Sequence, residues 1–207
     1  MRLGILGGTF NPIHLGHLLL AETARETLQL DRVVFIPTAQ PPHKRARDLA
    51  PALRRMEVVE AAIRHHPAFA CSDVELTRSG PSYSIETVRI LRAQLPNAKL
   101  FLLIGQDLLK VRWVGWEELK RLCTVVVVPR DAGHGAKGGG RGAPSRGLRW
   151  LTMARVDVSS SDIRARVRAG RTIRYLVPPA VERLIIRHRL YGLPPSGTSA
   201  DGAGAPD

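Results

Sequence analysis

Apolar runs and helical stretches alternate along most of the chain. Apolar runs that end at Gly or Pro are typical of buried strands, and Leu, Ala and Val at helical spacing are typical of amphipathic helices. The predicted strands are residues 3–6, 33–36, 69–76, 99–104, 123–128 and 148–156. The predicted helices are residues 15–28, 53–65, 82–95, 116–122 and 162–169. This alternation indicates βαβ units.

The apolar character of the strands predicts how the sheet is built. Residues 125–128 are all Val, and an unbroken apolar run fits a parallel strand that is buried on both faces. We therefore predict an α/β fold, Rossmann-like and doubly wound, with a mainly parallel sheet flanked by helices. Such sheets bind ligands at the carboxyl ends of their strands. Those ends fall at residues 7–8, 37–44, 105–107 and 129–130.

The 207 residues predict a single domain at residues 1–192. A Gly-rich basic segment at 131–147 is expected to be flexible, and the tail at 193–207 to be disordered, because neither can bury enough apolar surface. No apolar run is long enough for a membrane span. Two cysteines, Cys71 and Cys123, are too few for a disulfide framework and are expected to be buried free thiols. The predicted location is cytoplasmic, with no membrane partner.

The charge balance is strongly basic, with 31 Lys and Arg against 18 Asp and Glu, a formal net charge of +13. Such a surplus attracts nucleotides, phosphates or nucleic acid. The sequence has neither an aromatic RNA-recognition motif nor zinc-finger spacing, so nucleic acid is an unlikely partner on these grounds. A basic nucleic-acid-binding module nevertheless stays open as an alternative function.

The first candidate phosphate site is the sequence GGTFNPIHLGH at residues 7–17. Gly7 and Gly8 allow a sharp turn and a close approach to a ligand. A helix that starts near residue 15 would direct its amide groups into the same space, and His14 and His17 would share one face of its first turn. The competing interpretation is a glycine turn with two incidental histidines. Neither a P-loop motif nor a dinucleotide-binding G-x-G-x-x-G motif is present.

The second candidate phosphate site is the sequence VSSSDIR at residues 158–164. Its serines would cap a helix that ends before Gly170. This would place hydroxyl groups, a helix N-terminus and Arg164 together. The competing interpretation is an ordinary N-cap beside a surface arginine.

The two motifs, in this order, resemble the [HT]-x-G-H and I-S-S-T-x-I-R signatures of the nucleotidyltransferase superfamily. From residue 1 to about 192 the chain resembles the bacterial nicotinate-nucleotide adenylyltransferases. Further matches are PPHK at 41–44, PSYSIETV at 81–88, GQD at 105–107, WVGWEEL at 113–119, VVPR at 127–130 and VPPAVERLIIRHRLYG at 177–192. The departures are Asn11 for Asp, Ser161 for Thr, Glu86 for Asp, a Gly-rich segment after Arg130, and Leu53 for a family Arg, with Arg54 and Arg55 adjacent.

The resemblance implies transfer of AMP from ATP to nicotinate mononucleotide, with Mg²⁺ as cofactor and deamido-NAD and pyrophosphate as products. It implies catalytic roles for His14, His17 and Arg164. The implied ATP-binding residues are Gly7, Gly8, Thr9, Phe10, His14, His17, Gly105, Asp107, Ser159, Ser160, Ser161, Ile163 and Arg164. The implied residues for the second substrate are Asn11, His43, Lys44, Tyr83, Ser84, Trp113 and Arg130.

Several alternatives stay open at this point. The acceptor could be nicotinamide mononucleotide or phosphopantetheine, although the phosphopantetheine enzymes usually carry Thr in place of His14 and lack the Trp113 and Arg130 block. The chain could also be an inactive nucleotide sensor. Trp113 could be ordinary core packing, Asp107 a helix cap and Lys44 plain surface charge. Neither the metal position nor the formation of a homo-oligomer is determined by the sequence.

Overall fold

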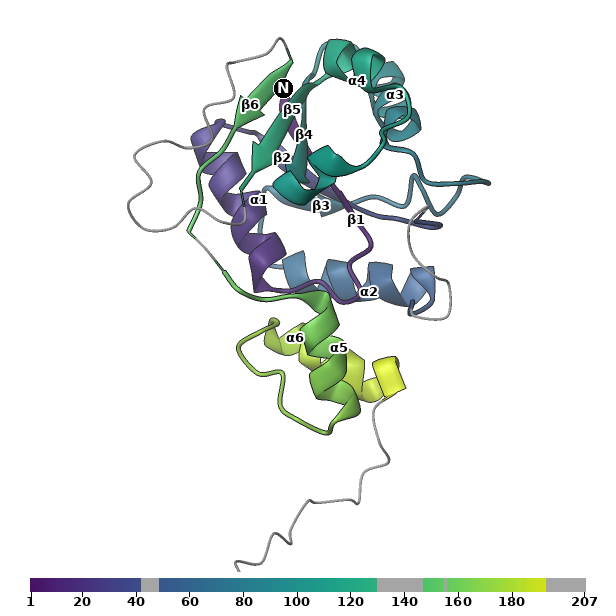
Figure 1. Cartoon of the computed structure of the whole chain (residues 1–207), viewed down its shortest axis with the longest axis vertical. Coiled ribbons are helices and arrows are strands. Elements are labelled where there is room, and N and C mark those ends of the chain that lie inside the picture. The colour runs from purple at the N-terminus through teal and green to yellow at the C-terminus, as the bar shows by residue number, and fades with distance from the viewer. Residues whose placement is uncertain (42–48, 130–146, 155, 193–207) are drawn as a thin grey trace, which may run out of the picture.

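The computed structural model describes residues 1–41, 49–129, 147–154 and 156–192. In this part of the chain six strands form one sheet (Figure 1). The strands are β1 (Arg2–Gly8), β2 (Arg32–Pro37), β3 (Phe69–Cys71), β4 (Lys99–Gly105), β5 (Thr124–Val128) and β6 (Leu148–Trp150). Their order is β3-β2-β1-β4-β5-β6, and every neighbouring pair is parallel. This is the Rossmann strand order, so the predicted doubly wound α/β fold is confirmed.

Helices cover both faces of the sheet, as a parallel sheet requires. Helices α1 (Leu15–Thr27) and α2 (Ala52–Ile63) lie on one face, and α3 (Ser84–Gln94) and α4 (Trp116–Leu122) lie on the other (Figure 1). Side chains alternate between two apolar clusters along each strand. In β5, Val126 and Val128 pack toward α1 and α2, whereas Val125 and Val127 pack toward α3 and α4. The sheet therefore has a hydrophobic core on each of its two faces.

The C-terminal helices α5 (Ser160–Arg168) and α6 (Pro179–Arg187) lie beyond α2, on the side away from the sheet (Figure 1). Ile163 and Val167 of α5 and Val181 and Ile185 of α6 are buried in the same cluster as α1 and α2. Two 3₁₀ turns, η2 (Gln106–Lys110) and η3 (Leu190–Gly192), complete the described elements. The second phosphate motif, at the start of α5, is thus fixed to the rest of the molecule by apolar packing.

Two predicted strands are shorter than expected. β3 ends at Cys71, because the amides of Leu76 and Thr77 turn back to the carbonyl of Asp73 instead of continuing the ladder. β6 ends at Trp150, and after one more bond, from the Leu151 amide to β5, the chain leaves the sheet. The apolar runs at 69–76 and 148–156 predicted longer strands because apolar side chains beyond the strands, such as Val74 and Leu151, still pack against the two cores.

Two helices begin two residues away from their predicted starts, and α2 begins at Ala52 rather than 53. α5 begins at Ser160 rather than 162, because Ser159 is its N-cap and accepts a hydrogen bond from the Asp162 amide. α3 begins at Ser84 rather than 82, because the Ser82 hydroxyl accepts a hydrogen bond from the Gln40 amide across the loop. Side-chain capping and loop contacts of this kind decide helix ends, which periodicity alone locates only approximately.

The two cysteines are free thiols, but only Cys123 is buried, while Cys71 is half-buried. Burial raises the pKa of both thiols to about 12, so both are protonated near neutral pH. No helix of the described residues is long and apolar enough to cross a membrane. The segment predicted to be flexible lies outside the described residues except for Gly147, whose carbonyl accepts a bond from the Val125 amide. The predicted disordered tail at 193–207 also lies outside them.

Candidate active site

The first phosphate motif follows the carboxyl end of β1, next to the point where the winding of the sheet reverses between β1 and β4. Phe10 takes a left-handed backbone conformation, with φ of 45°, and its side chain is only 2% exposed. Its ring packs against Phe35 and, edge to face, against the ring of His17. A strained residue that is held by aromatic packing on both sides fixes the path of the loop into α1.

The two histidines of this motif lie together at the start of α1. His14 is the N-cap and His17 stands in the first turn, with ring centroids 3.8 Å apart. The Nδ1 atom of His17 accepts a hydrogen bond from the His14 backbone N–H at 3.3 Å. When Nδ1 accepts, a neutral ring carries its proton on Nε2, which is then a hydrogen-bond donor. The loop therefore sets both the position and the tautomer of His17.

The second phosphate motif caps α5. The Ser159 hydroxyl accepts a bond from the Asp162 amide and donates one to the Asp162 carboxylate, at 3.1 and 2.7 Å. Ser161 is exposed and accepts a bond from Arg164 Nη2 at 3.4 Å. The N-terminal amides of a helix and a nearby guanidinium together form a site for an anion.

Two hydrogen bonds join the second motif to the first, although the two are about 150 residues apart in the sequence. Arg164 Nη1 donates to the carbonyl of Asn11 at 2.8 Å, and the Ser160 hydroxyl donates to the carbonyl of Pro12 at 2.8 Å. The loop between β1 and α1 is thus the common support of both sites. The relative position of the two helix N-termini depends on this loop.

Both motifs line one cleft with a volume of about 850 Å³. This is within the size range of small-molecule sites. The cleft brings together most of the predicted residues, which come from β1, α1, the start of α3, the end of β4 and the start of α5. Those that line it are Gly7, Gly8, Thr9, Phe10, His14, His17, Tyr83, Ser84, Gly105, Asp107, Trp113, Ser159, Ser160, Ser161 and Arg164.

Trp113 and Asp107 lie on the segment that follows β4. The Trp113 indole donates its N–H to the carbonyl of Leu108 at 2.7 Å, and its ring packs against Trp116 at 5.3 Å. Trp113 is half-buried, so part of its surface faces the cleft while the rest joins the α3–α4 core. Asp107 is exposed in the first turn of η2.

Two predicted residues that the structure describes do not line the cleft, and three more lie outside the described residues. Asn11 is 2% exposed, and its side-chain oxygen accepts a bond from the Ala50 amide at 3.0 Å, so its predicted role toward the second substrate stays a prediction. Ile163 is fully buried in the core, so its side chain does not line the cleft, and its predicted contact with ATP stays a prediction. The other three, His43, Lys44 and Arg130, lie outside the described residues.

Two buried charged groups were not predicted from the sequence. Arg55 is 1% exposed and donates hydrogen bonds to backbone carbonyls beside the cleft. Glu75 lines the cleft with only 5% exposure, and its carboxylate accepts a bond from the Thr87 hydroxyl at 2.7 Å. Burial raises the pKa of Glu75, and the bonds from Thr87 and Ser82 oppose this shift. One pattern in the sequence indicates the burial of Arg55, because this residue shares the apolar face of its helix with Val58 and Val59.

The strand order, the cleft at the strand ends and the two joined phosphate sites define a nucleotidyltransferase. In agreement, the family model described as cytidylyltransferase-like matches residues 5–166. The fold is also that of a solved Plasmodium falciparum nicotinic acid mononucleotide adenylyltransferase complexed with NaAD. The TM-score is 0.76 at 16% identity, and 93% of this chain and 98% of that chain are covered.

Closer relatives define the branch of this family. A Synechococcus sp. (strain JA-3-3Ab) protein named "Probable nicotinate-nucleotide adenylyltransferase" is 45% identical over 195 residues, covering 92% of this chain and 94% of the relative. A Shouchella clausii protein with the same name is 42% identical over 194 residues, with 92% and 97% covered. The chain belongs to the nicotinate-nucleotide adenylyltransferase family. The resemblance given by the sequence motifs is thereby confirmed.

Proposed function

We propose that this chain transfers AMP from ATP to nicotinate mononucleotide, giving deamido-NAD and pyrophosphate in NAD biosynthesis. The observation that carries the proposal is the junction of two phosphate sites on one support, beside a cleft large enough for two substrates. Both sites are assigned to ATP, because the enzyme has to bind the transferred phosphate and the leaving pyrophosphate at the same time, and the rest of the cleft is assigned to the acceptor. The names of the relatives supply the identity of the acceptor.

The reaction is a substitution at phosphorus. An oxygen of the mononucleotide phosphate forms a bond to the α-phosphorus of ATP, and the bond from that phosphorus to the bridging oxygen of pyrophosphate breaks. A phosphate dianion is already a nucleophile, so the chain does not have to supply a general base. Its contribution is to align the two substrates and to stabilise the negative charge that moves onto pyrophosphate.

His14 and His17 are placed to bind the phosphates of ATP at the N-terminus of α1. Since the His17 ring accepts at Nδ1, Nε2 is the donor atom of the neutral ring. Arg164 and the first turn of α5 supply a second positive region for the β- and γ-phosphates. Gly105 and Asp107, at the end of β4, are assigned to adenosine. These assignments follow from the positions in the cleft and from the motifs.

The second substrate is assigned to the part of the cleft lined by Tyr83, Ser84 and Trp113. We propose that the Trp113 ring stacks on the pyridine ring and that the backbone at Ser84, at the start of α3, binds the nicotinate carboxylate. His43, Lys44 and Arg130 keep their predicted roles toward the mononucleotide phosphate and carboxylate as proposals, because they lie outside the described residues.

Mg²⁺ is proposed as the cofactor that neutralises charge on the ATP phosphates. The described residues contain no cluster of three or more His, Cys, Asp or Glu side chains that could hold a metal by themselves. Three exposed carboxylates line the cleft singly, those of Asp107, Asp157 and Asp162. This donor set fits Mg²⁺, which is commonly bound by one or two carboxylates together with substrate phosphates.

Pyrophosphate release tests the proposal. The purified chain is mixed with ATP and Mg²⁺, and nicotinate mononucleotide, nicotinamide mononucleotide and phosphopantetheine are compared as acceptors. We expect the highest kcat/KM with nicotinate mononucleotide. A preference for another acceptor would support adenylyl transfer but refute nicotinate mononucleotide as the acceptor. Release with none of them, together with salt-sensitive binding of nucleic acid, would favour the binding-module alternative. The cytoplasmic location stays a prediction.

A further inference from the structure

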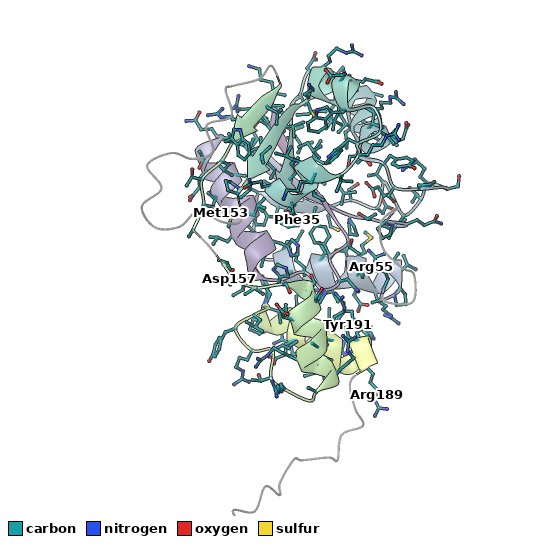
Figure 2. All side chains as sticks on the ribbon, viewed as in Figure 1. Phe35, Arg55, Met153, Asp157, Arg189 and Tyr191 are labelled. Atoms are coloured by element: carbon teal, nitrogen blue, oxygen red, sulfur yellow. The ribbon has the colours of Figure 1, made fainter. Side chains whose placement is uncertain are left out.

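Arg55 is a buried cation that bonds only to the backbone in the described part of the chain. It stands in the first turn of α2, and Figure 2 shows it between the sheet and the C-terminal helices. Its Nε donates to the carbonyl of Ala50 at 2.9 Å. Its Nη1 donates to the carbonyls of Thr9 and Thr38, each at 2.8 Å. The planar fork of a guanidinium is suited to hold several acceptors at fixed angles.

No carboxylate forms an ion pair with Arg55 within residues 1–41, 49–129, 147–154 and 156–192. Burial lowers its pKa, yet an arginine stays protonated at neutral pH. Tyr191 lies between Arg55 and the C-terminal end of the described chain (Figure 2). Burial raises the pKa of its hydroxyl, so Tyr191 is neutral and supplies no counter-charge. The buried charge is therefore compensated by the dipoles of the backbone carbonyls. The positions of these carbonyls depend in turn on the Arg55 guanidinium.

These carbonyls belong to two different parts of the cleft. Thr9 is in the first phosphate motif, on the side assigned to ATP, whereas Thr38 follows β2. Both residues line the cleft, but Arg55 does not. One nitrogen atom, Nη1, thus bonds to both segments directly beyond the last β1–β2 bond, which runs from the Thr38 amide to the Gly8 carbonyl, and it fixes the two carbonyls past the end of the sheet. Ala50, bonded to both Arg55 and Asn11, fixes the start of α2 to the same loop.

We propose that Arg55 is a positioning residue for adenylyl transfer, which holds the Thr9 and Thr38 segments together so that ATP and the acceptor are aligned. It acts through backbone carbonyls and does not touch either substrate. The proposal rests on the adenylyl transfer inferred above. Alignment matters because a small misplacement of reacting groups lowers the rate much more than it weakens binding.

The test is the Arg55→Lys variant, which keeps the charge but loses the fork. One ammonium on a flexible stem cannot hold the same set of carbonyls. We expect kcat to fall roughly 10- to 100-fold, with the KM values of ATP and of the acceptor changed less than about 3-fold. The matched control is Arg54→Lys, since the adjacent Arg54 is exposed and pairs with Glu57. This control should keep the wild-type kcat.

The outcomes separate this role from others. A folded Arg55→Lys variant with an unchanged kcat, or with a changed melting temperature only, overturns the proposal. A large rise in one KM at constant kcat also overturns it, because it would indicate direct binding of that substrate. A wild-type protein that releases no pyrophosphate with any acceptor refutes the proposed function itself, whereas an active wild-type protein with an active variant refutes only the role of Arg55.

A measurement on the wild-type protein covers the case in which Arg55→Lys does not fold. The Nε–H group of Arg55, bonded to the buried Ala50 carbonyl, should give a slowly exchanging NMR signal, assigned through its own side-chain carbons. We expect this signal to shift when a non-hydrolysable ATP analogue binds alone and also when nicotinate mononucleotide binds alone. A signal that responds to only one of them, or to neither, contradicts a link between the two sides.

Discussion

The two phosphate sites use the same element, a helix N-terminus, but they are built differently. At α1 the proposed donors are imidazole rings, and Phe10 packs the loop against the core. At α5 the donors are serine hydroxyls and a guanidinium, several of which already bond to the protein. The first site is thus supported by the sheet, whereas the second site depends on the first through Arg164 and Ser160.

The loop between β1 and α1 explains how two distant sequence motifs form one site. The carbonyls of Asn11 and Pro12 face α5, and the carbonyl of Thr9 faces Arg55 on α2. One short loop therefore carries bonds from two helices as well as the histidines of α1. We expect disturbances of the first site to affect catalysis most, and disturbances of the second site to affect both catalysis and stability.

The largest expected effect is that of His17→Ala. Loss of one donor that stabilises transition-state charge costs roughly 10²- to 10³-fold in kcat, or about 3 kcal/mol. Steady-state pyrophosphate release measures it, with His65→Ala as the control, since His65 is an exposed histidine in the turn that follows α2. Near-normal turnover in His17→Ala would show that the first site does not act on the ATP phosphates.

A second, smaller effect is expected for Arg164→Lys. A lysine cannot reach both the Asn11 carbonyl and Ser161 in the way that the guanidinium does. Hydrogen bonds to charged groups contribute about 1.5–3 kcal/mol, so kcat/KM for ATP should fall about 10-fold or more. Arg168→Lys, an exposed arginine on the same helix, is the control. Equal kinetics for the two variants would mean that Arg164 serves only the structure.

A third prediction concerns the bond between the two sites. Ser160→Ala removes the hydroxyl that donates to the Pro12 carbonyl, and the free energy of unfolding should fall by about 1 kcal/mol. Urea unfolding measures this change, provided that the dependence of the unfolding free energy on urea concentration is the same in both proteins. Ser161→Ala, which leaves that bond intact, should change stability by less than about 0.5 kcal/mol. If both variants are equally stable, α5 is not held by the first loop in the way described.

The smallest expected effect lies outside both sites, where Glu57 of α2 bonds to Arg54 and to His188 after α6. The bond from Arg54, followed by that from His188, lowers the pKa of Glu57 below its ordinary value of 4.5. A lowered carboxyl pKa adds stability above the ordinary pKa, and this stability is lost as the pH falls through the lowered value.

Glu57→Gln should therefore be less stable than the wild type at pH 7, by less than about 1 kcal/mol because the pair is exposed to solvent. Thermal unfolding from pH 7 down to pH 3 measures the difference, which should shrink on acidification. A difference that stays constant with pH would show that the charge of Glu57 is not the cause. Activity should stay at the wild-type level throughout, since the phosphate sites are unaffected.

The sequence alone determined the fold class and the two motifs. Short apolar strands, one of them with four consecutive Val residues, that end at Gly or Pro leave few arrangements other than a buried parallel sheet, because burial on both faces is encoded locally. The residue types of the motifs, His14, His17 and Arg164, likewise carry their chemistry with them. Matches in the right order then indicated the family before any geometry was available.

Only the tertiary structure decided which residues support the candidate site from the interior of the protein. Leu53, which was read at the position of a family arginine, is 74% exposed, while the nearby Arg55 is buried and bonds to the cleft loops. Asn11 and Ile163 lie within the two motifs, but their side chains are buried. A sequence states what each side chain can do, but hydrogen bonds between residues such as Arg164 and Asn11 depend on distances that only the folded chain sets.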